Sequence, residues 1–81
     1  MEVKNTIKIE FVELDSENPK NVIVSFSYTV NETVEKSSLK LPLTASIQED
    51  IRKAVKAFVE KRRVENLFSL AKEVEGEFLE T

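Results

Sequence analysis

The sequence contains no cysteine and no histidine, and it has a single glycine and two prolines among its 81 residues. Without cysteine there is no disulfide, and zinc, haem and iron–sulfur centres lose their usual protein ligands. The first residues alternate charged and apolar side chains, and no apolar run approaches the ~18–20 residues that span a bilayer. We therefore expect a soluble, cytoplasmic protein with no metal, no other cofactor and no membrane contact.

The composition also gives no sign of more than one domain. The chain has no internal repeat, no low-complexity stretch and no linker rich in glycine, proline or serine, so a single domain over residues 1–81 is expected. A domain of this size leaves much of its surface exposed, and such chains are usually secured by a disulfide, a metal or a partner subunit. Because the chain has no cysteine for a disulfide and lacks the usual metal ligands, we expect a homodimer or another protein partner.

The net charge of −3 conceals a sorting of charge along the chain. Residues 46–63 hold six Lys or Arg against three acids, a net charge of +3, and residues 64–81 hold one Lys against five Glu, a net charge of −4. A protein that binds polyanions is normally basic overall. The balance therefore argues against a general nucleic-acid binder.

The first half of the chain predicts an antiparallel three-stranded meander, with strands at about 6–14, 21–30 and 33–41. The alternation of period two in these segments places one set of side chains on a core. Asn31-Glu32 can close a tight hairpin, although Asn-Gly would be the stronger signal. A three-residue loop would turn the leucines of the third strand to the other face, so the two-residue turn is favoured. It pairs Val30 with Thr33, Tyr28 with Glu35, Phe26 with Ser37, Val24 with Leu39 and Val22 with Leu41.

The second half of the chain predicts helix. Ser46 and Glu49 match a capping box, in which each side chain bonds the backbone N–H of the other residue, and a helix is expected over about 46–63. Its apolar residues form one stripe that can lie across the sheet: Ile47, Ile51, Ala54, Val55 and Phe58. On the reverse face of the sheet, the alternation predicts a small apolar cluster that another helix should cover: Val12, Leu14 and Ile23.

A second helical segment is expected at about 64–79, because apolar residues recur there at spacings of three and four. At ~100° per residue, the first stripe is centred ~40° from Ile47 and the second ~230° from it, almost on the opposite side. Asn66 is an acceptable N-cap and favours a break, whereas good helix formers without Gly or Pro at 60–66 favour continuation; the sequence leaves both open. These residues are predicted to form an oligomer or partner interface: Val64, Leu67, Phe68, Ala71, Val74 and Phe78.

Two further sets of residues are candidates for binding. Tyr28 lies opposite Glu35 near the hairpin tip, which makes it a candidate exposed anchor unless Phe58 or the C-terminal segment covers it. A basic cluster could contact phosphates, although its charges also suit the negative end of the helix and the neighbouring acids: Arg52, Lys56, Lys61, Arg62 and Arg63. The structural interpretation of this cluster is favoured.

No catalytic residue is predicted. Without His or Cys, a base or nucleophile would have to come from carboxylates, Lys, Tyr or Ser, and none forms a recognisable constellation. We therefore expect an α+β fold, with a three-stranded meander packed by one helix and followed by a second C-terminal helical segment. The function favoured is a non-enzymatic interaction module that self-associates, a kind of small chain frequent among accessory proteins of phages and mobile elements. The alternative is a nucleic-acid-associated protein that uses the basic helix at residues 52–63.

Overall fold

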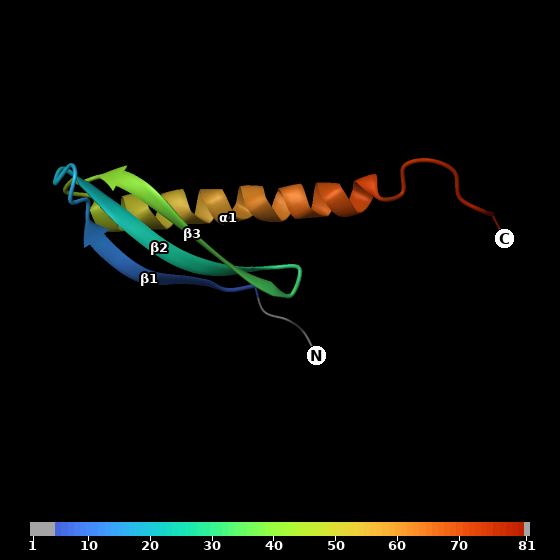
Figure 1. Cartoon of the computed structure of the whole chain (residues 1–81), viewed down its shortest axis with the longest axis horizontal. Coiled ribbons are helices and arrows are strands. Elements are labelled where there is room, and N and C mark those ends of the chain that lie inside the picture. The colour runs from blue at the N-terminus through green and yellow to red at the C-terminus, as the bar shows by residue number, and fades with distance from the viewer. Residues whose placement is uncertain (1–4, 81) are drawn as a thin grey trace.

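The computed structural model describes residues 5–80 and contains a three-stranded antiparallel sheet and one long helix (Figure 1). Strands β1 (Ile7–Leu14), β2 (Asn21–Val30) and β3 (Thr33–Pro42) lie in the order β1-β2-β3. Helix α1 (Ile47–Lys72) packs on one face of this sheet. The α+β class and the meander are confirmed. Among the described residues no helix is both long and apolar enough to cross a membrane.

The second C-terminal helical segment is not a separate element, and of the two outcomes that the sequence left open the helix takes the continuous one. Residues 64–72 belong to α1 itself, which runs without interruption through residues 60–66 to Lys72. Residues 73–80, the remainder of the segment expected to be helical, lie outside any helix, and Gly76 among them has a φ of 105° that an α-helix does not allow. In Figure 1 the last turns of α1 extend beyond the sheet, and the segment that follows the helix runs on in the direction away from the strands.

The hairpin between β2 and β3 has the predicted turn and register. Asn31 and Glu32 both have positive φ, 49° and 66°, which is the conformation of the type I′ turn that suits the twist of the two strands. Val30 faces Thr33 and Val24 faces Leu39, and the other three predicted pairs are also present. The two-residue turn is therefore confirmed, and it places alternate β2 side chains on the helix-facing side.

Replacing Glu32 by glycine is expected to stabilise the protein by about 0.5 kcal/mol. A left-handed conformation costs a residue with a Cβ roughly 1 kcal/mol, and the greater freedom of glycine in the unfolded chain offsets part of that gain. Urea unfolding of Glu32→Gly measures the difference. Glu32→Ala is the control, because it removes the same side chain and keeps the strain; equal effects of the two variants would contradict this explanation.

An irregularity in β1 changes which side chains face the helix. The register shifts between Ile9 and Phe11, so that Phe11 faces Ser25 whereas Val12 faces Val24. Directly opposed residues of an antiparallel pair lie on the same face of the sheet, and an extra residue in one strand reverses the alternation beyond it. Phe11 is thereby turned to the reverse face, and Val12 to the helix-facing side.

The predicted cluster on the reverse face is therefore wrong for two of its three members. Val12 and Leu14 face Val24 and Val22, which are buried under α1, and so share their side of the sheet. Only Ile23 lies on the reverse face, in register with Glu13 and Lys40.

The core is formed by the helix-facing side of β2 and the sheet-facing side of α1. Phe58 makes edge-on contacts with Phe26 and Tyr28, with ring centroids 5.3 and 5.9 Å apart. The buried residues are Val22, Val24, Phe26, Tyr28, Val30, Val55 and Val59. A helix is roughly 10 Å wide and strands lie about 4.8 Å apart, so one helix covers about two strands. Because α1 packs on β2 and β3, the helix-facing side of β1 remains open.

The start of α1 differs from the predicted capping box. The Ser46 side chain makes no capping bond to the helix, because its backbone (φ −101°, ψ 24°) lacks the extended conformation that aims a cap oxygen at the first turn. Instead Ser46 Oγ and Thr44 Oγ1 donate to the Asp50 carboxylate, the latter at 2.6 Å. Asp50 therefore replaces Glu49 as the acidic residue that fixes this end of the helix.

Candidate interaction surface

The C-terminal half of α1 presents apolar side chains to solvent. Val64, Leu67 and Phe68 are 63–65% exposed, although all three lie within regular helix. Val59 is the last buried residue of α1, and at ~100° per residue the three side chains lie roughly opposite the direction in which α1 meets the sheet. We call Val64, Leu67, Phe68 and Ala71 the outer stripe. It comprises four of the six residues predicted as an interface.

The other two predicted interface residues lie outside the helix. Val74 and Phe78 belong to residues 73–80, where they are 75% and 79% exposed. Because α1 ends at Lys72, these two residues do not continue the outer stripe along the helix. The structure thus brings together the first four residues and leaves the last two on a separate segment, which we call the C-terminal arm (residues 73–80).

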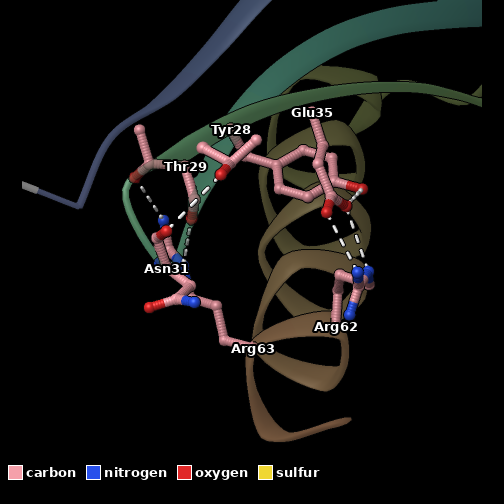
Figure 2. Close-up of polar contacts among 7 residues, drawn as sticks. Tyr28, Thr29, Asn31, Glu35, Arg62 and Arg63 are labelled. Carbon is pink, nitrogen blue, oxygen red and sulfur yellow. Dashed lines mark hydrogen bonds and ion pairs between the residues drawn. The ribbon is translucent and has the colours of Figure 1, made fainter. Parts of the chain in front are cut away.

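Arg62 ties α1 to the β2–β3 hairpin. Its Nε and Nη2 donate to the two carboxylate oxygens of Glu35 at 3.0 and 2.9 Å, and the hydroxyl of Tyr28 donates to Glu35 Oε1 at 3.1 Å (Figure 2). A guanidinium that contacts a carboxylate through two nitrogens is both strong and directional. The pair therefore fixes the position of α1 just before the outer stripe begins.

Arg63 fastens the opposite flank of α1 to the start of β1. Its Nε donates to the carbonyl oxygen of Thr29 at 2.9 Å (Figure 2). Its Nη2 donates to the carbonyl oxygen of Thr6 at 3.2 Å. The backbone N–H of Thr6 in turn donates to Thr29 Oγ1 at 2.9 Å. The two arginines thus brace both flanks of the helix within residues 60–66, where the sequence left a break or a continuation open. Good helix formers favour the continuation of the helix to Lys72.

These contacts divide the five predicted phosphate-binding residues into two groups. Arg62 and Arg63 are engaged within the chain, whereas Arg52, Lys56 and Lys61 are exposed. Lys56 makes only a long contact with Glu60, at 3.9 Å. Arg62 and Arg63 therefore act as a structural brace, but their partners are Glu35 and backbone carbonyl oxygens and not the neighbouring acids expected from the sequence. Nucleic-acid binding by the remaining cations stays a prediction.

Tyr28 is not an exposed anchor in this chain, because its side chain is only 4% exposed. Phe58 covers it, as the alternative interpretation of the sequence held. Burial and the hydrogen bond to Glu35 raise the pKa of the Tyr28 phenol, so the hydroxyl stays protonated and remains a donor. Its role is to help orient Glu35 toward Arg62.

The Arg62–Glu35 pair is expected to contribute about 1 kcal/mol to stability, a modest value because both side chains keep some exposure, 36% and 27%. A double-mutant cycle with Arg62→Ala and Glu35→Gln, followed by urea unfolding, measures the coupling. Glutamine preserves an acceptor for Tyr28. The same cycle at Lys56 and Glu60, whose side chains are 72% and 62% exposed, should give a coupling near zero; a coupling as large as that of the first pair would refute the bracing role.

The one buried carboxylate recorded in the described chain belongs to a turn. Asp15 Oδ1 accepts from the backbone N–H of Glu17 at 3.0 Å, and Oδ2 lies 3.2 Å from Lys40 Nζ. The Glu17 N–H and the Lys40 charge hold the pKa of Asp15 below its usual value, and partial desolvation opposes them. Asp15 therefore closes the connection from β1 to β2. Within residues 5–80, no group of three or more acidic, His or Cys side chains is arranged to hold a metal ion.

Sequence reasoning missed one candidate surface, the open helix-facing side of β1. Ile7, Ile9, Val12 and Leu14 form a line there and are 39–64% exposed. The signal for it was the adjacent apolar pair Phe11-Val12, which interrupts the alternation where the register shifts.

No protein-family model matches the chain, and no match was found among curated proteins or solved structures.

Proposed function

We propose that the chain is a small, non-enzymatic interaction module that self-associates as a homodimer through the outer stripe of α1. The observation that supports this most directly is the exposure of Val64, Leu67 and Phe68 on a helix that extends past its own sheet. Apolar side chains grouped in this way on a soluble surface are typical of interaction sites. A second copy of the chain supplies a matching stripe.

The distribution of charge favours an antiparallel arrangement of the two helices. In a parallel pair the segment 46–63, with a net charge of +3, and the segment 64–81, with a net charge of −4, would each lie beside its own copy. In an antiparallel pair each segment lies nearer its opposite, which lowers the electrostatic energy. A two-fold axis perpendicular to the helices produces this arrangement. Because the outer stripe points away from the sheet, the two sheets remain on the outside.

The outer stripe alone is small for a stable dimer. It covers two turns of helix, whereas specific interfaces usually bury about 800 Å² on each partner. Pairing Val64 of one chain with Ala71 of the other brings the four apolar residues of each stripe together and places the C-terminal arm of each chain beside the partner's α1. The arms, with Val74 and Phe78, are then positioned to enlarge the contact.

The molecular mass in solution, measured by light scattering over a range of concentrations, tests this function. We expect twice the mass of one chain at high micromolar concentration, with dissociation on dilution. A protein that remains monomeric at hundreds of micromolar would overturn the proposal. A larger assembly would also contradict it, because the two-fold pairing of stripes closes on itself.

A further inference from the structure

The open helix-facing side of β1 adjoins the flank of α1 that carries Arg63, and we call these two surfaces together the trough. Its floor is the line of apolar side chains Ile7, Ile9, Val12 and Leu14, which α1 leaves uncovered. β1 is an edge strand of the sheet, and α1 packs on β2 and β3. Four apolar side chains in a row on the core side of a sheet are what a second layer would normally bury.

One wall of the trough carries positive charge. Arg63 donates to the carbonyl oxygen of Thr6, just before β1, and so identifies the flank of α1 that faces this strand. Lys56 and Arg52 precede Arg63 by seven and eleven residues, which places both within ~20° of it around the helix. Both are exposed. The trough therefore combines an apolar floor with a basic wall.

The C-terminal arm has the complementary chemistry. Its sequence, EVEGEFLE, contains four glutamates, and its apolar residues Val74, Phe78 and Leu79 are 75–93% exposed. Glu75 makes one contact with Lys72, at 3.6 Å. An acidic segment with apolar side chains matches a basic wall above an apolar floor, because each class of side chain then meets its favoured partner.

We infer that the trough of each chain binds the C-terminal arm of a second copy, so that the two chains exchange arms. This inference rests on the proposed self-association. With Val64 opposite Ala71 of the partner, residue 72 of the partner lies level with Arg63 along the helix axis and about 90° around the helix from it, so the arm has to pass around this flank to enter the trough. From Arg63 to Arg52 the helix rises about 16 Å, and eight extended residues reach roughly 26 Å. The arm is thus long enough to run along the trough, with Phe78 and Leu79 on the floor and glutamates toward Lys56 and Arg52.

Disulfide trapping tests the arm exchange, because the natural chain has no cysteine. Chains carrying Val12→Cys are mixed with isotope-labelled chains carrying Leu79→Cys, oxidised, and the mixed disulfide is quantified by mass spectrometry. The control replaces Val12→Cys by Phe11→Cys, the adjacent residue on the reverse face of the same strand. We expect about tenfold more mixed disulfide with Val12→Cys, because a disulfide requires Cα atoms within about 7 Å.

The possible results separate this inference from the proposed dimer. A monomeric natural chain would overturn both proposals. A dimeric natural chain that gives equal yields with Val12→Cys and Phe11→Cys, or no mixed disulfide, would overturn the arm exchange alone. A chain carrying both Val12→Cys and Leu79→Cys that forms an internal disulfide at high dilution, in place of the mixed one, would show that the arm folds back onto its own trough.

Discussion

Phe26→Ala is expected to remove most of the stability of the fold. Phe26 lies in the central strand, is 1% exposed and contacts the rings of both Tyr28 and Phe58. Truncating a buried phenylalanine costs about 3–5 kcal/mol, because the transfer free energy is lost and a cavity remains. At ~0.05–0.15 kcal/mol per residue, a chain of this length has roughly 4–12 kcal/mol in total. The variant should therefore be partly or largely unfolded at room temperature.

Phe11→Ala is the matched control, since it removes the same side chain from the reverse face of β1. Phe11 is 62% exposed, and substitutions at such positions usually change stability by less than about 0.5 kcal/mol. Urea unfolding followed by circular dichroism compares the two variants, at one fixed protein concentration because self-association would itself add stability. Similar losses at Phe26 and Phe11 would mean that the shift in β1 does not turn Phe11 away from the core.

The β2–β3 hairpin could be predicted from the sequence because two independent constraints agree there. The alternation of β2 from Val22 to Val30 requires one buried face, and a one-residue change of register would move Leu39 and Leu41 off it. The Asn31-Glu32 turn fits only that register. Where local turn chemistry and the apolar pattern coincide, the sequence determines the pairing.

The strand β1 was predicted, but not which of its side chains face the helix beyond Ile9, because two adjacent apolar residues compete there for the core. The adjacent apolar residues Phe11 and Val12 cannot both face the core in a regular strand. The structure resolves the conflict with a register shift after Ile9, which turns Phe11 outward. A shift of this kind depends on which of the two side chains gains more free energy by burial. That gain depends on where α1 packs, so the open side of β1 could not be predicted from the pattern of the strand.

Whether the helix breaks or continues at residues 60–66 could not be predicted from the sequence either. Two apolar stripes of opposite phase fit both a broken and a continuous helix, and intrinsic propensities differ by only tenths of a kcal/mol per residue. The contacts of Arg62 with Glu35 and of Arg63 with Thr6 and Thr29 join residues more than 25 positions apart. Long-range contacts of this kind cannot be deduced from local pattern, and they leave the outer stripe on an unbroken helix.

The double substitution Leu67→Asp with Phe68→Asp is expected to abolish self-association and leave the fold intact. Each large apolar side chain contributes about 1.5–3 kcal/mol when it is buried, so losing two should raise the dissociation constant by at least about a hundredfold. In the single chain both side chains are exposed, at 64% and 65%. The folded monomer should therefore lose little beyond the cost of placing acids near a helix C-terminus.

Ser69→Asp separates the loss of the stripe from that cost of acidic charge. Ser69 lies in the same turn but ~200° around the helix from Leu67, away from the outer stripe. Light scattering over a range of concentrations should find Ser69→Asp dimeric at high micromolar concentration, like the natural chain, and the double variant monomeric throughout. The circular dichroism spectra of the two variants should be the same at low concentration, where both are monomeric. Association that survives in the double variant would place the contact elsewhere on the chain. Association lost equally in Ser69→Asp would mean that charge near the helix end, rather than the apolar stripe, governs the pairing of the chains.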